Sequence, residues 1–196
     1  MTAKVFATER PISGNVVLGI DPSLTGFAVT VLPISPTIPD YSTWVYKSPK
    51  RGVERLSDIT LWLSDTLRPF DVLSVAMESG VVQSHSAMVL GELAGILKLY
   101  CYDYFQEDNA RFPLQVPPMS LKKFIAGKGN GVAKNQILLK VYQSWGVEFT
   151  DDNAADSFGL AHIARLDYLK QPPEYVYRAD VMKKLSDPKF RDTQYL

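Results

Sequence analysis

The sequence predicts an α/β fold in which a mixed sheet of five strands is flanked by helices. Three short runs rich in β-branched residues follow one another at 16–20, 26–32 and 42–47, and two further strand-like runs stand at 71–77 and 115–116. Consecutive strands favour antiparallel pairing, whereas strands that alternate with helical patterns favour parallel pairing with helices on the faces. The combination therefore indicates a mixed sheet.

Helical patterns separate and follow these strands. Apolar residues recur every three or four positions from Val53 to Leu67, which predicts an amphipathic helix over 51–67. Further helices fit 84–104, 119–126, 133–145 and 153–169.

The length suits one well-buried domain, because 196 residues are too few for two comfortable ones. We expect this domain to span 16–170. The segment 1–15 is then an N-terminal extension. The polar segment 171–196, which contains Pro172 and Pro173 and has no clear period, is a C-terminal tail.

The composition excludes several classes of protein. One cysteine, Cys101, cannot form an internal disulfide and is expected to be a buried thiol in a reducing cytoplasm. The segment 1–15 lacks the apolar core of a signal peptide, and no apolar run approaches the roughly 20 residues of a membrane helix. We therefore expect a cytoplasmic protein with no membrane partner.

Charge is balanced overall but separated along the chain. The net charge is zero, yet no acidic residue lies between Asp108 and Glu148. The cations of that stretch are Arg111, Lys122, Lys123, Lys128, Lys134 and Lys140. This separation predicts a cationic surface that faces an anionic pocket.

Two acids stand at the ends of predicted strands. Asp21 follows the run 16–20, and Glu78 follows 71–77. In the predicted topology these two strands are parallel neighbours, so both acids emerge at the edge where open α/β sheets place their sites. Taken alone, Asp21 is explained more simply as an acid that caps its own turn. A bare carboxylate is costly to bury, so Glu78 must be solvated, paired or bound to metal.

A third acidic group opens the last predicted helix. Asp156 lies one turn inside it between Ala155 and Phe158, and Asp152 and Asn153 share its face. Acids at a helix start are also explained by capping and by the helix dipole. Asp156 is harder to explain in that way because it lies inside the helix.

Carboxylates from two strands and one helix suit hard cations. Mg²⁺ and Mn²⁺ choose oxygen ligands, and water and phosphate complete their coordination. Two such ions about 4 Å apart cleave phosphodiesters. Asp21, Glu78 and Asp156 are therefore candidate metal ligands, with two ions per site expected.

Five segments in order resemble the motifs of RuvC-type Holliday junction resolvases. The segment 19–26, GIDPSLTG, resembles the first motif, and 77–80, MESG, resembles the second. The segment 90–95 is similar to the helix that follows, 122–134 to the basic segment, and 153–156 to the last acidic motif.

The resemblance implies a ribonuclease H-like fold and a homodimer that binds four-way DNA junctions. It implies paired symmetric nicks that leave 5′-phosphate ends and depend on Mg²⁺ or Mn²⁺. Asp21, Glu78 and Asp156 would bind metal, and Lys122 and Lys134 would contact the DNA backbone near the scissile phosphate. A solvated helix face is the alternative for these lysines. The expected DNA-binding residues are Lys122, Lys123, Lys128 and Lys134.

Three departures from the family pattern matter, one of which is a basic loop made slightly longer than usual by residues 131–133. The fourth ligand position carries Asn153, so either Asn153 contributes through its amide oxygen or a water molecule, or adjacent Asp152 takes the role. Val81 and Val82 stand where an aromatic residue is common, which predicts weak base insertion and a weak sequence preference. These departures suit a phage-type member with broader branched-DNA substrates, in a bacterial cell or a phage-infected host.

Other classes remain open from the sequence. Sugar kinases and actin-like ATPases share the fold, but they need a glycine-rich phosphate loop soon after the first acid. An inactive junction-binding module would lack an acid, and only Asn153 points that way. Ribonuclease H-type nucleases have similar acids. The lysine-rich segment favours the resolvase reading, in which Asn153 and Lys134 join the three acids as catalytic candidates and no small-molecule substrate is expected.

Overall fold

The computed structural model describes residues 3–35, 37, 40–80 and 87–191. Its strands are β1 (Lys4–Ala7), β2 (Gly14–Asp21), β3 (Phe27–Pro33), β4 (Ser42–Tyr46), β5 (Phe70–Glu78) and β6 (Leu114–Val116). Its helices are α1 (Gly52–Leu67), α2 (Ala87–Tyr104), α3 (Asp108–Arg111), α4 (Pro118–Ala126), α5 (Lys134–Trp145), α6 (Asp152–Leu169), α7 (Val176–Leu185) and the 3-10 helix η1 (Pro188–Phe190). The predicted α/β class is confirmed.

The sheet has six strands in the order β1-β4-β3-β2-β5-β6, one more than expected. β2 lies in its middle, antiparallel to β3 and parallel to β5, as the sequence predicts. The additional strand β1 falls in the segment expected to be an extension and pairs antiparallel with β4. It is a short and largely exposed edge strand, so it has no apolar alternation to reveal it.

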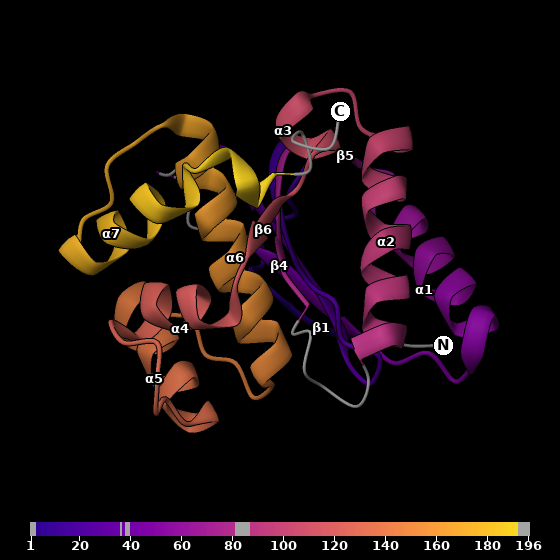
Figure 1. Cartoon of the computed structure of the whole chain (residues 1–196), viewed down its shortest axis with the longest axis horizontal. Helices are drawn as coiled ribbons and strands as arrows, with labels where there is room; N and C mark the ends of the chain where they lie inside the picture. The colour runs from indigo at the N-terminus through magenta and orange to yellow at the C-terminus, as the bar shows by residue number, and fades with distance from the viewer. Residues whose placement is uncertain (1–2, 36, 38–39, 81–86, 192–196) are drawn as a thin grey trace.

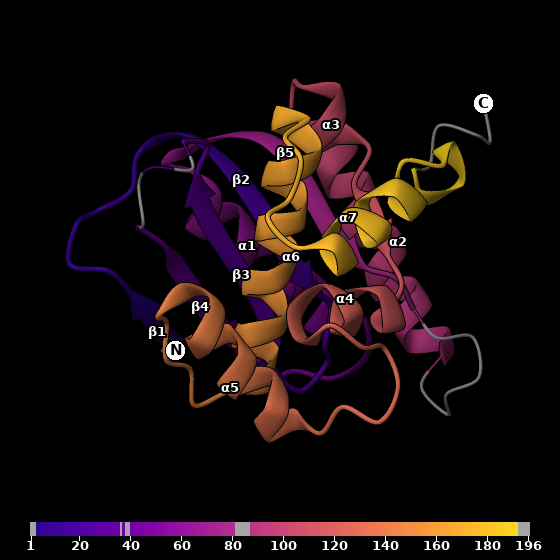
Figure 2. The same cartoon turned by 90° about the vertical axis from the view of Figure 1, so that its left-hand side faces the viewer.

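The elements form layers around this sheet. α1 and α2 cover one face, and α6 lies directly against the other (Figure 1). α4, α5 and α7 lie outside α6, which therefore runs between the sheet and these helices (Figure 2). In the described part of the chain, no helix has both the length and the apolar content needed to cross a membrane.

Side chains of β2 alternate between two cores. Val16, Leu18 and Ile20 pack in the core under α1 and α2, whereas Val17 packs in the core under α6. Cys101 of α2 is fully buried in the first core, and burial raises the pKa of its thiol, as expected of a structural cysteine.

The predicted periodicity of α1 holds except at its start. Leu56, Ile59, Leu63 and Leu67 are buried against the sheet. Val53 is 77% exposed, so the expectation that it shares the buried face was wrong: burial begins one turn later, at Leu56.

A glycine sets the distance between β2 and α6. A Cβ atom on Gly19 would lie 2.1 Å from the carbonyl oxygen of Ser157 and 2.3 Å from the backbone nitrogen of Ala161. The helix backbone therefore rests on the strand, and only glycine at position 19 permits this approach. Buried alanines of α6, including Ala154 and Ala155, keep the rest of the contact equally close.

Buried hydroxyls connect the same helix to the next two strands. Thr30 Oγ1 lies 2.7 Å from Thr43 Oγ1 and 2.8 Å from Ser157 Oγ. Ser157 Oγ also donates to the carbonyl of Ala154 at 3.0 Å. The hydroxyls of Thr30, Thr43 and Ser157 thus all have partners, which offsets their desolvation.

The segment expected to be a C-terminal tail contains two described helices, α7 and η1, although its sequence shows no clear period. α7 packs on α4 through an ion pair between Lys123 Nζ and Asp180 at 3.0 Å and a hydrogen bond from Lys184 Nζ to Ser120 Oγ at 3.2 Å. Its buried face includes the charged residue Arg178, which breaks the apolar pattern that sequence analysis relies on.

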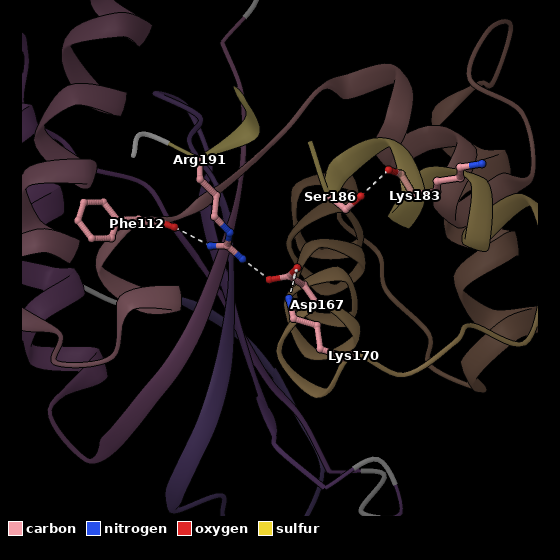
Figure 3. Close-up of polar contacts among 6 residues, drawn as sticks. All are labelled: Phe112, Asp167, Lys170, Lys183, Ser186 and Arg191. Carbon is pink, nitrogen blue, oxygen red and sulfur yellow. Dashed lines mark hydrogen bonds and ion pairs between the residues drawn. The ribbon is translucent and has the colours of Figure 1, made fainter. Parts of the chain in front are cut away.

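Arg191, the residue after η1, connects two distant parts of the fold. Arg191 donates to the carbonyl of Phe112 at 2.7 Å and forms an ion pair with Asp167 of α6, which also accepts from Lys170 (Figure 3). This contact joins the end of the described chain to both α6 and the segment before β6.

Candidate active site

Two acids leave the sheet side by side. Ile20 of β2 is in parallel register with Met77 of β5, so Asp21 and Glu78 follow at the carboxyl ends of neighbouring strands. Both line one pocket of about 150 Å³. Its other lining residues are Pro22, Ser79, Gly80, Leu90 and Ala94.

The third acid comes from α6. Asp156 lies just after the first turn of the helix, next to Ser157, whose carbonyl faces Gly19. Its negative charge raises the pKa of both Asp21 and Glu78, so the three carboxylates lie near one another. Asp156 Oδ1 is buried and has no hydrogen-bond partner among the described residues. A buried oxygen without a partner destabilises the folded protein unless a ligand binds it.

Burial and mutual repulsion disfavour the charged forms of these acids. Burial first, and then the charges of Glu78 and Asp156, raise the pKa of Asp21 well above its ordinary value. Burial and Asp156 raise the pKa of Glu78 to about 7. The pKa of Asp156 is also about 7, because of burial and the nearby charge of Asp152. The cluster lacks enough positive charge to balance it.

Two of the four predicted lysines lie at this cluster. The charge of Lys122, in α4, opposes part of the rise in the pKa of both Glu78 and Asp156, so it acts on these two acids. Lys134, the first residue of α5, forms an ion pair with Asp152, and its side chain is 81% exposed.

The other two lysines point elsewhere. Lys123 is held by Asp180 of α7, and Lys128 is exposed in the loop that follows α4. The structure therefore brings Lys122 and Lys134 to the acids and leaves Lys123 and Lys128 outside.

The two candidates for a fourth ligand differ in their surroundings. The carboxylate of Asp152 binds Lys134, and its charge contributes to the raised pKa of Asp156. The amide of Asn153 faces the turn after β2, where a Cβ on Gly26 would lie 2.5 Å from Asn153 Nδ2. Asp152 is thus electrostatically part of the cluster.

Sequence reasoning singled out 90–95 as a motif but did not predict that this part of α2 forms a wall of the pocket. Leu90 and Ala94 line the pocket beside Asp21 and Glu78. Nothing in an ordinary leucine or alanine distinguishes a pocket wall from a core position. Val81 and Val82, where the sequence departs from the resolvase pattern, lie outside the described residues.

The donor set fits a hard divalent cation that brings further ligands with it. Within the described residues, no group of three or more His, Cys, Asp or Glu side chains could hold a metal ion. Mg²⁺, however, is ordinarily bound by one or two carboxylates together with waters and substrate phosphates. Asp21, Glu78 and Asp156 offer oxygen donors of that kind, and the orphaned Oδ1 of Asp156 needs a partner.

The strand order, the helix against the central strand and the acids at the carboxyl ends define an α/β fold of the ribonuclease H-like class. No family model matches the chain, and no curated protein sequence matches it either.

Solved structures of Holliday junction resolvases share the fold. The chain is similar to Thermus thermophilus RuvC, with 23% identity and a TM-score of 0.59 over 79% of this chain and 96% of that one. The same T. thermophilus protein in complex with Holliday junction substrate gives 21% identity and a TM-score of 0.59 over 79% and 94%. The chain is also similar to the yeast mitochondrial Holliday junction resolvase Ydc2, with 16% identity and a TM-score of 0.52 over 90% of this chain and 82% of that one.

Proposed function

We propose that this protein is a metal-dependent, structure-specific DNA endonuclease that resolves Holliday junctions and other branched DNA by paired symmetric nicks. The observation that carries the proposal is the meeting of Asp21, Glu78 and Asp156 from three elements beside Lys122. The shared fold with T. thermophilus RuvC, which has been solved with Holliday junction substrate, supports four-way DNA as the substrate class.

Asp21, Glu78 and Asp156 would hold one or two Mg²⁺ or Mn²⁺ ions. Asp152 is our preferred fourth ligand, because its charge acts on Asp156, whereas Asn153 faces the turn after β2. A cation there would favour the charged forms of acids that otherwise titrate near neutral pH.

The reaction is hydrolysis of a phosphodiester, in which a water oxygen attacks phosphorus in line and the bond to the 3′ oxygen breaks. The products are a 5′-phosphate and a 3′-hydroxyl. Bound metal ions supply activation of the water and stabilisation of the leaving oxygen. Lys122, whose charge acts on Glu78 and Asp156, would contact a non-bridging oxygen of the scissile phosphate. Exposed Lys134 and Lys128 would bind neighbouring backbone phosphates.

Two opposing nicks require two active sites, and the described chain forms one acid cluster of this kind. We therefore propose a homodimer that engages both sides of a junction. The substitution of valines at 81 and 82 for an aromatic residue favours a phage-type member that acts in the cytoplasm of a bacterium or an infected host. Four-way junctions, forks and flaps would then all be cut.

The direct test incubates purified protein with end-labelled four-way junctions, with and without Mg²⁺ or Mn²⁺, and maps the cuts on each strand. Asp156→Asn should reduce cleavage at least about 100-fold while it retains junction binding, because a ligand is lost but no positive charge is removed. Asp65→Asn is the matched control, since Asp65 is an exposed acid of α1 that pairs with Arg68.

Symmetric metal-dependent cuts in the wild-type protein would support the proposal. Full activity of Asp156→Asn would remove Asp156 from the site. Binding without cleavage under every metal condition would instead identify a junction-binding module. Inertness towards four-way junctions, forks and flaps alike would refute a branched-DNA function.

A further inference from the structure

A second pocket, of about 160 Å³, lies between α6 and the helices outside it. It is separate from the acid cluster and shares no lining residue with it. Its charged and polar lining residues are His162 and Arg165 of α6, Gln171 and Glu174 of the following loop, and Arg178 of α7. Phe124, Trp145, Leu166, Pro172 and Pro173 complete the wall.

Arg178 is a buried cation with spare hydrogen-bonding capacity. Its side chain is 6% exposed, and its Nε donates to the carbonyl of Phe124 at 3.1 Å. The guanidinium group lies over the rings of Trp145, at 4.2 Å, and Tyr175, at 5.0 Å. Its Nη2 is buried without a hydrogen-bond partner among the described residues, and Arg178 forms no ion pair within them.

Arg165 is a second cation without a counter-charge in the described chain. Its Nη2 bonds the neutral ring of His162 at Nδ1, at 3.0 Å. The acid two positions further along the helix, Asp167, is already bound by Arg191 and Lys170 (Figure 3). Burial lowers the pKa of Arg165 to about 10, as desolvation of a cation does.

His162 adds a further donor. Because arginine can only donate, Nδ1 of His162 accepts from Arg165, and the ring proton then resides on Nε2. Burial and the two arginines lower its pKa well below the usual range, so the ring is neutral. The charged and polar wall of the pocket therefore consists mainly of hydrogen-bond donors with two positive charges.

One acid stands at this pocket. Glu174 is exposed and forms no ion pair among the described residues. Burial lowers the pKa of Arg178, and the charge of Glu174 opposes part of that shift. Its position at the surface means that it weakens rather than cancels the positive field inside.

We propose that this pocket binds an oxyanion of the phosphate class through Arg165 and Arg178. Guanidinium groups match phosphate oxygens in geometry, and a group with up to two negative charges suits two unpaired arginines. The phosphate could belong to a free phosphorylated small molecule or to the DNA backbone. The proposal is independent of the acid cluster and goes beyond the nuclease function.

The first experiment measures thermal unfolding of the full chain in metal-free buffer with increasing inorganic phosphate, against sodium chloride at equal ionic strength. Phosphate should raise the melting temperature of the wild-type protein more than chloride does, since a ligand of the folded state stabilises it. Arg165→Gln should weaken phosphate binding about tenfold, because a charge-assisted contact is lost. Arg68→Gln, which removes an exposed arginine that follows α1, should behave as wild type.

Glu174→Gln distinguishes binding from a merely structural pocket. Loss of this charge should strengthen phosphate binding about two- to fivefold, whereas it would leave a purely structural arginine pair unchanged. Arg178→Lys retains the charge and loses the planar fork, and should also weaken phosphate binding. Equal responses of the wild-type protein, Arg165→Gln and Glu174→Gln would overturn the proposal.

Junction binding separates the two sources of phosphate. If the DNA backbone occupies the pocket, inorganic phosphate competes with junction binding in the wild-type protein and less so in Arg165→Gln. If a free phosphate compound occupies it, Arg165→Gln leaves junction affinity unchanged while its phosphate binding is weakened. Either result supports the pocket, and neither depends on whether the acid cluster cuts DNA.

Discussion

The two faces of the sheet hold their helices in different ways. Under α1 and α2 the contact is made mainly by large apolar side chains, such as Leu18, Leu63 and Leu97, which are fully buried. Under α6 the backbone of the helix rests on Gly19, and buried hydroxyls of Thr30 and Ser157 bridge the layers.

This difference means that one face mainly stabilises the fold, whereas the other mainly fixes the position of α6 and its acid. Large side chains bury more area and tolerate small shifts of the helix, so the face under α1 and α2 can hold the sheet without defining any distance closely. Backbone contact at Gly19 tolerates almost no shift, and the acid carried by α6 lies one residue from that contact. Three substitutions and one change of pH would test the contrast.

The largest effect should come from Leu63→Ala under α1. Leu63 is fully buried, so the truncation should lower the free energy of unfolding by about 2–5 kcal/mol. Cleavage per folded molecule should be unchanged, because α1 does not line the acid pocket. Urea unfolding measures the first quantity. Leu61→Ala, at a residue 66% exposed, is the matched control and should change stability little.

Gly19→Ala should cost less stability and far more function. The added methyl group meets backbone atoms that cannot move aside, which costs about 1–3 kcal/mol as overpacking. Displacement of α6 by even an ångström should reduce cleavage per folded molecule about 100-fold. Gly91→Ala in α2 is the control, since nothing lies within 4 Å of its Cβ position. Unchanged cleavage in Gly19→Ala would contradict the proposed role of this contact.

The acid cluster should make the metal-free protein less stable as pH rises. The pKa values of Glu78 and Asp156 are about 7 in the folded state and ordinary in the unfolded state, so the folded state binds more protons between these values. That stability is complete below the unfolded pKa values and is lost as pH rises through about 7.

Between pH 6 and pH 8 this loss is on the order of 1 kcal/mol for each group, or a few degrees in melting temperature. Thermal unfolding without divalent metal should show the decrease in the wild-type protein and a smaller one in Asp156→Asn. Saturating Mn²⁺ should oppose it, because the ion binds the charged carboxylates. An equal pH dependence of both proteins would argue against a raised pKa at Asp156.

The smallest change concerns Lys134. Its ion pair with Asp152 is largely exposed, so Lys134→Ala should alter stability by less than about 1 kcal/mol. Junction binding should weaken, and the slope of log affinity against log salt should decrease by about one, as for one lost phosphate contact. Lys140→Ala in the same helix is the control, since Lys140 bonds only Gln143 in the described chain. Equal slopes would place Lys134 outside the DNA interface.

Most of the fold could be predicted because its strands are apolar and its helices periodic. The runs that became β2, β3 and β5 carry this signal, and so does α1 apart from Val53. β1 is short, exposed and at an edge, and α7 buries Arg178, so neither contains the pattern that reveals a strand or a helix.

The acids of the candidate site were predictable for a different reason. Asp21 and Glu78 interrupt apolar strands at positions that a parallel register brings together. The partners of Lys123 and Lys134 could not be read in this way, because an exposed lysine has no sequence signal for the acid that it meets. The role of Leu90 and Ala94 of α2 as a pocket wall could not be predicted either.

The hydrogen-bonded hydroxyls of Thr43, Thr30 and Ser157 also favour one register of β4 against β3. Side chains alternate between the faces of a sheet, so a slip of β4 by one residue would turn Thr43 towards the apolar core under α1 and α2. Each hydroxyl left without a partner would cost about 1–3 kcal/mol. A sheet with shifted strands is therefore less stable than the native one. The residues responsible make no contact with DNA or metal in the proposed reaction.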